Sequence, residues 1–172
     1  MSRRVVVPLD RTAHAEAALR VLPEICEEGD EVILLSVAEP ARQTLRGMRP
    51  GRVVRGGVRI TGDEAGAFSR DYPVYAETGD QVIQGQLDEL QNYLLTLATK
   101  LEGQGFKVVV IVEISEEPAK AIVDVARRVH PTFIAMVRTT DPRLGERLFG
   151  TVAQHVIREN VAPVLILPSS AN

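Results

Sequence analysis

The stretch FKVVVIVEISEEPAKAIVDVARRVHPTFIAMV, residues 106–137, decides the fold because two apolar runs flank one amphipathic segment. The runs at 106–114 and 132–137 are short and rich in valine and isoleucine, which is typical of strands buried on both faces. Between them, Pro118 suits the first turn of a helix, and the apolar residues that follow recur at helical spacing: Ile122, Val123, Ala126 and Val129. A strand, a helix and a second strand in this order predict parallel strands.

The same alternation extends along the rest of the chain. The predicted strands are 4–10, 32–37, 106–114, 132–137 and 163–168, and the predicted helices start near 12 and 118 or cover 81–102 and 152–159. Asp10 or Thr12 can cap the first helix, and Pro23 should kink or end it. The pattern predicts an α/β, Rossmann-like fold, a doubly wound five-stranded parallel sheet with helices on both faces.

Residues 40–80 interrupt this alternation with seven arginines, five acidic residues and many glycines. Loops of this length in a compact domain are usually functional or disordered. A lid, a hairpin around Gly56 and Gly57, and a disordered insertion all remain open. We expect residues 1–172 to form a single domain that carries this insertion.

The bulk composition excludes several functions. A formal charge of −3 and a pI near 5.7, with both signs interspersed, disfavour nucleic-acid binding, and no apolar run approaches the ~20 residues of a membrane helix. The lone Cys26 cannot form an internal disulfide. We therefore expect a soluble, cytoplasmic protein.

Motifs for metal binding or catalysis are missing from the sequence. The three histidines show no metal-ligand spacing, and no serine or cysteine lies in a nucleophile motif. We expect neither a metal nor catalysis.

Four stretches carry a family resemblance: VVVPLDRTAHAEAALR (5–20), VILLSVAEP (32–40), EEPAKAIVDVARR (116–128) and LFGTVAQHVIRENVAPVLILP (148–168). In combination they resemble the universal stress protein family over nearly the whole chain apart from the insertion. The resemblance implies an adenine nucleotide alpha hydrolase-like fold, usually dimeric. In some branches ATP or AMP binds at the carboxyl ends of the strands, where open parallel sheets generally hold ligands.

The nucleotide-binding branch resembles a pattern of glycine, two residues, glycine, nine residues, then glycine followed by serine or threonine. Gly150 and Thr151 match its end, but Val137 and Thr140 stand where its first two glycines would be. Branched side chains there keep the backbone from approaching phosphates closely. The helix that begins at Gly150 still offers free amides to an anion, and Arg138, Arg143 or Arg147 could supply charge instead.

Other positions carry over one at a time. Asp10 resembles the acid beside the nucleoside and Val37 the residue beside the adenine, although Asp10 could simply cap a helix and Val37 could simply end a core strand. The candidate nucleotide-binding residues are Leu9, Asp10, Val37, Val137, Arg138, Thr140, Gly150 and Thr151.

The apolar run at 163–168 should form an edge strand, and an unprotected apolar edge invites pairing. In the family this strand often pairs with its copy, so the candidate dimer interface is Val164, Leu165, Ile166 and Leu167. We expect a non-catalytic stress-response homodimer with weak or absent nucleotide binding, no required cofactor and a protein partner that the sequence does not identify. The alternative is an ATP or AMP sensor, or a slow ATPase, in which arginines replace the glycines.

Overall fold

The computed structural model describes residues 2–38, 80–137 and 150–168. Its elements are β1 Arg4–Pro8, α1 Ala13–Ile25, β2 Glu31–Ala38, α2 Asp80–Glu102, β3 Lys107–Ile114, α3 Pro118–Val129, β4 Phe133–Val137, α4 Thr151–Glu159 and β5 Val164–Leu167. Every predicted strand and helix is present, so the predicted alternation is confirmed. The predicted insertion at 40–80 lies almost wholly outside the described residues.

Two local expectations are refined. Thr12 is the residue that caps α1, through its side-chain oxygen, while Asp10 lies outside the helix. Pro23 does not end the helix, because α1 continues to Ile25. Pro23 lies in the last turn, where its missing N–H removes only one hydrogen bond.

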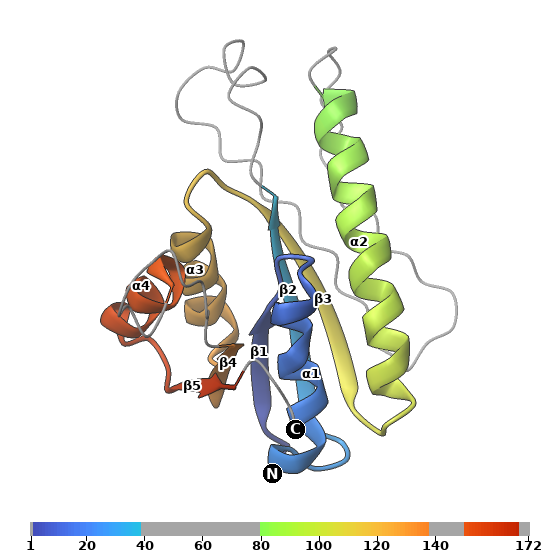
Figure 1. Ribbon diagram of the computed structural model, residues 1–172, viewed down its shortest axis with the longest axis vertical. Coiled ribbons are helices and arrows are strands. Elements are labelled where there is room, and N and C mark those ends of the chain that lie inside the picture. The colour runs from blue at the N-terminus through green and yellow to red at the C-terminus, as the bar shows by residue number, and fades with distance from the viewer. Residues whose placement is uncertain (1, 39–79, 138–149, 169–172) are drawn as a thin grey trace.

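The five strands form one parallel sheet in the order β3-β2-β1-β4-β5 (Figure 1), which confirms the predicted doubly wound fold. The strand order reverses at β1, whose neighbours are β2 on one side and β4 on the other. Strand β5 lies at an edge, as predicted, and β3 lies at the opposite edge of the described sheet.

The core has two layers because successive side chains of a strand point to opposite faces of the sheet. Val5 and Val7 of β1 pack in one apolar cluster with α1 and α2, whereas Val6 packs in the other with α3 and α4. Figure 1 shows these two pairs of helices on opposite sides of the sheet. All three valines are fully buried, which explains the continuous apolar run of β1.

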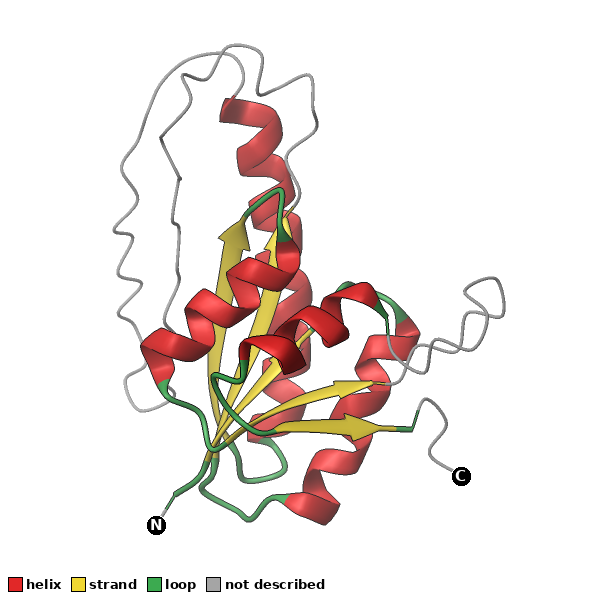
Figure 2. Cartoon of the chain, turned by 90° about the vertical axis from the view of Figure 1, so that its left-hand side faces the viewer, coloured by secondary structure: helices red, strands yellow, loops and turns green. Residues whose placement is uncertain are grey.

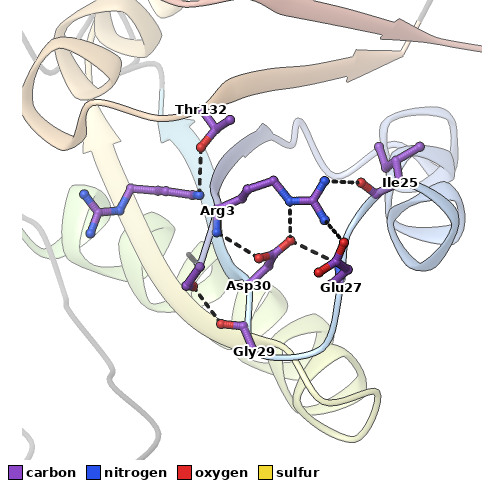
Figure 3. A network of polar contacts seen from close by, with 8 residues as sticks. Arg3, Ile25, Glu27, Gly29, Asp30 and Thr132 are labelled. Carbon is purple, nitrogen blue, oxygen red and sulfur yellow. Dashed lines mark hydrogen bonds and ion pairs between the residues drawn. The ribbon is translucent and has the colours of Figure 1, made fainter.

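Charged side chains occupy the amino ends of the strands (Figure 3). Arg3 donates to the carbonyl oxygen of Ile25 at the end of α1 (3.3 Å), and Arg4 donates to that of Val129 at the end of α3 (2.6 Å). Because the two arginines are neighbours on a strand, they reach helices on opposite faces of the sheet. Each cation also lies at the negative end of a helix dipole. The two arginines therefore connect the start of β1 to the ends of α1 and α3.

No helix in the described ranges is both long and apolar enough to span a membrane.

Candidate functional site

The sheet opens between β1 and β4 toward the carboxyl ends of the strands. These two strands pair only at Val5 with Phe133 and at Val6 with Ile134. Strand β1 stays paired with β2 as far as Pro8, and β4 stays paired with β5 as far as Val137. In Figure 2 the strands accordingly fan apart toward their arrowheads. This is the point where the strand order reverses, and the crevice outside it is where sheets of this kind bind ligands.

Asp10 follows β1, at the carboxyl end of the sheet where β1 and β4 part, and is exposed. One of its carboxylate oxygens, Oδ1, accepts hydrogen bonds from the backbone N (3.0 Å) and the hydroxyl (2.6 Å) of Thr12. Thr12 in turn accepts from the backbone N of Ala15, which caps α1. Asp10 therefore orients the capping residue, and this contact uses only one of its two oxygens.

Leu9 and Val37 lie at the same carboxyl end of the sheet and are less exposed than Asp10. Leu9 is buried, and its backbone N donates to the carbonyl oxygen of Leu35 at 2.7 Å. The hydroxyl of Ser36, also buried, donates to the carbonyl oxygen of Leu9 at 2.8 Å and ties the end of β1 to β2. Val37 is half-buried and packs against the α3 and α4 cluster. Ser36 was not predictable from the sequence, because its partner lies 27 residues away.

Val137 is the last residue of β4 and pairs with Leu167 of β5. Its half-buried side chain packs against the cluster under α1 and α2. A half-buried valine side chain thus packs against the core at the position that the family pattern gives to a glycine.

Gly150 is the N-cap of α4, and Thr151 is the first residue of the helix, as predicted. Gly150 has an ordinary backbone conformation, with φ −62° and ψ 160°, and no side chain with which to cap the helix. The first amides of α4 are therefore left without that cap, which favours an anion there. Arg138 and Thr140 lie outside the described residues, as do Arg143 and Arg147.

Four further side chains, not predicted as site residues from the sequence, connect α2 to the β1–α1 turn and to the first turn of α1. Tyr93 of α2 donates its hydroxyl to Glu16 of α1 at 3.0 Å, and Arg11 lies 3.3 Å from Glu89 of α2. Arg11 has a positive φ of 65°, which is unusual for a residue with a side chain. Glu89 and Tyr93 are four residues apart and so lie on one face of α2. That face of α2 braces the turn that carries Asp10.

The environment of Tyr93 disfavours its ionised form. Partial burial raises the pKa of the Tyr93 phenol, and the hydrogen bond to Glu16 and the negative charges of Glu16 and Asp10 raise it further. Arg11 opposes this shift only partly. Tyr93 is therefore a neutral hydrogen-bond donor at physiological pH.

Glu113 of β3 is a buried acid near the same end of the sheet, and it was not predicted as a site residue from the sequence. It lies opposite Val37 in the β2–β3 register and forms an ion pair with Arg128 of α3.

Across the described ranges, no group of three or more histidine, cysteine, aspartate or glutamate side chains could hold a metal ion.

The candidate dimer residues are spread unevenly between core and surface. Leu167 is buried and packs in the core, Val164 and Ile166 are half-buried, and Leu165 is 37% exposed. Leu165 and Ile157 of α4 are the exposed large apolar side chains of the described chain. Strand β5 therefore presents an apolar side chain at an edge of the sheet.

An open doubly wound sheet that splays at its reversal point defines a class of α/β proteins that bind ligands beyond the carboxyl ends of the strands. The model of the universal stress protein family matches residues 1–168. The chain therefore belongs to the universal stress protein family, and its function is universal stress protein-like. A search of curated proteins finds no match.

Solved structures share this fold over nearly the whole chain. The hypothetical protein MJ0577, whose structure served a structure-based assignment of biochemical function, is 23% identical with a TM-score of 0.71, and the match covers 100% of this chain and 99% of that one. A universal stress protein from Burkholderia pseudomallei is 16% identical, with a TM-score of 0.58 and 96% of both chains covered. One from Archaeoglobus fulgidus is 18% identical, with a TM-score of 0.57 and coverage of 96% and 93%. At these identities the similarity establishes the fold.

Proposed function

We propose that this chain is a non-catalytic, cytoplasmic stress-response protein that acts as a homodimer through β5 and binds adenine nucleotides weakly or not at all. The position of Val137 carries the nucleotide part of this proposal. It is a regular strand residue that pairs with Leu167 and packs against the core, where the family pattern has a glycine. Close approach of phosphates to the main chain needs the space that this side chain fills.

A second candidate function is an adenine-nucleotide sensor or slow ATPase. Two observations favour it: the exposed carboxylate of Asp10 at the β1–β4 crevice and the N-terminus of α4 at Gly150, which lacks a side-chain cap. In this reading, arginines outside the described residues replace the glycines. Both candidates use the same crevice and differ in affinity.

Thermal unfolding in the presence of millimolar ATP or AMP separates them. A ligand at a hundred times its dissociation constant stabilises a protein by about 2.7 kcal/mol, so a sensor should show a clear shift. We expect little or no shift. A large shift that disappears in Gly150→Leu would establish the sensor instead, and a large shift that persists in that variant would place the ligand elsewhere.

The homodimer is supported by the edge position of β5 and the exposure of Leu165. Pairing of β5 with its copy would be self-complementary about a twofold axis. Light scattering at micromolar concentration should give the mass of a dimer for the wild type and of a monomer for Leu165→Lys. Thr96→Lys, which adds the same charge to an exposed position of α2, should remain dimeric. A monomeric wild type would refute the dimer.

A further inference from the structure

Strand β3 is the second edge of the described sheet. Its length and composition make it more prone than β5 to pair with a further strand. It has eight residues against four for β5, and five consecutive positions, 108–112, are valine or isoleucine. Long apolar edge strands recruit further strands, because their backbone groups are free to pair. A second copy of this chain could therefore add to β3 unless something opposes it.

A partly buried ion pair lies near the carboxyl end of this strand. Glu113 points to the α3 face of the sheet, where its carboxylate contacts the guanidinium of Arg128. The side chain of Glu113 is 9% exposed and that of Arg128 is 43% exposed, so the pair keeps contact with water mainly through the arginine. The other end of β3 carries the exposed Lys107.

An added strand would remove water from this pair. Loss of solvent around a charged pair costs free energy that its mutual attraction often does not recover. Inward-pointing charges on edge strands oppose edge pairing in this way. Strand β5 has no charged residue among Val164, Leu165, Ile166 and Leu167, so the two edges of the sheet differ in kind.

We propose that the Glu113–Arg128 ion pair prevents a second copy of this chain from pairing with β3 and so limits assembly to a closed dimer. This inference rests on the proposed dimer through β5. In that dimer two five-stranded sheets meet at β5, and a β3 edge lies at each outer end. If these outer edges also paired, dimers would join end to end into an open filament.

The decisive variant is Glu113→Val with Arg128→Met, which replaces the pair by apolar side chains. Its matched control is Glu159→Val with Arg127→Met, because Arg127 and Glu159 form an ion pair between α3 and α4 whose side chains are 55% and 39% exposed. Both double variants remove one charge of each sign and add the same apolar groups. Sedimentation velocity over a concentration series should give species larger than a dimer for the first variant and a dimer for the control.

The same substitutions in the Leu165→Lys background separate this inference from the proposed dimer. There the first variant should turn monomers into dimers through β3. If the wild type is itself monomeric, the β5 dimer fails, but the Glu113 and Arg128 variant should still associate. Amide hydrogen exchange along β3 should slow in the assemblies, and slowing confined to other strands would overturn the inference.

A variant that is folded by circular dichroism and keeps the wild-type mass at every concentration also overturns it. If the double variant does not fold, Glu113→Val alone is the variant to test. It should fold, because valine is already the commonest residue of β3 and the Arg128 side chain can turn to solvent. It should associate, and Arg128→Met alone should not, because it leaves the Glu113 carboxylate in place. Association of the surface control to the same extent would likewise refute a specific role for this pair.

Discussion

The carboxylate of Asp30 accepts two hydrogen bonds from Arg3, one from the backbone N at 2.8 Å and one from Nε at 3.0 Å (Figure 3). The same carboxylate accepts from the backbone N of Glu27 at 3.0 Å. Only 4% of the Asp30 side chain is exposed. One buried acid therefore joins the start of β1 to the turn between α1 and β2.

Asp30→Ala should lower the free energy of unfolding by about 2–3 kcal/mol, because it leaves Nε of Arg3 and two backbone amides without their acceptor. Urea unfolding of both proteins measures the difference. The control is Glu27→Ala, which removes an ion pair to Arg3 made by a side chain that is 86% exposed. It should cost less than about 1 kcal/mol. Equal losses in the two variants would contradict a dominant role for Asp30.

Asp30 should also make stability depend on acid pH. Burial by itself raises the pKa of the Asp30 carboxyl, but the hydrogen bonds from Glu27 and Arg3 and the charge of Arg3 outweigh it and hold the pKa below its ordinary value. A lowered pKa contributes stability that is present above the unfolded pKa of about 3.9 and is lost as the pH falls through the folded value.

Urea unfolding at several acid pH values tests this contribution. The wild type should have a larger free energy of unfolding than Asp30→Asn. This difference should stay constant near neutrality and decrease as the pH falls below about 4. A constant difference down to the lowest pH at which both fold would refute it.

Tyr93 should ionise later than an ordinary tyrosine, whose pKa is about 10. In an ultraviolet absorbance titration, Tyr93→Phe should remove a phenol that ionises above this value. Glu16→Gln should lower the pKa of Tyr93 only in part, since burial is the largest cause of the shift. The hydrogen bond to Glu16 stabilises the fold below about pH 10 and is lost as the pH rises through the pKa of Tyr93. A full return to the ordinary pKa in Glu16→Gln would show that burial matters little.

Restoring the glycines should restore nucleotide affinity. We expect Val137→Gly with Thr140→Gly to show a larger ATP-dependent melting shift than the wild type, because both changes remove a Cβ and free the backbone. The control is Val137→Ala with Thr140→Ala, which also trims the side chains but keeps the Cβ. Shifts are compared within each variant, because loss of the Val137 side chain lowers stability without ligand. An equal gain in the alanine control would mean that side-chain bulk alone was limiting.

The periodic elements of this fold were predictable from the sequence. Helix α2 was predicted at 81–102 and runs over Asp80–Glu102, because Ile83 and the leucines that follow it recur at steps of four and three. Its end at Glu102 agrees with the predicted range. Strand β1 was predicted to reach Asp10, but the regular strand ends at Pro8. The backbone N of Leu9 still donates a hydrogen bond to β2, and the chain then turns at Arg11, which has a positive φ. No residue pattern in the sequence predicted this conformation of Arg11.

The candidate site was predictable only in outline. The carboxyl ends of β1 and β2 and the start of α4 were located, because parallel strands bring these positions to one edge. The contacts of Tyr93 with Glu16 and of Glu113 with Arg128 were not, since their partners are 77 and 15 residues apart and lie on different elements. Side-chain pairs of this kind leave no local pattern.

The sequence by itself determined which segments are helices and strands, their order and their parallel arrangement, because apolar periodicity and chain connectivity are local properties. Only the tertiary structure decided where β1 and β4 part, which carboxylates are buried, and that one edge strand lacks charged residues while the other carries a partly buried ion pair. These features depend on the distances between residues far apart in the chain, and those distances are set when the helices pack on the two faces of the sheet.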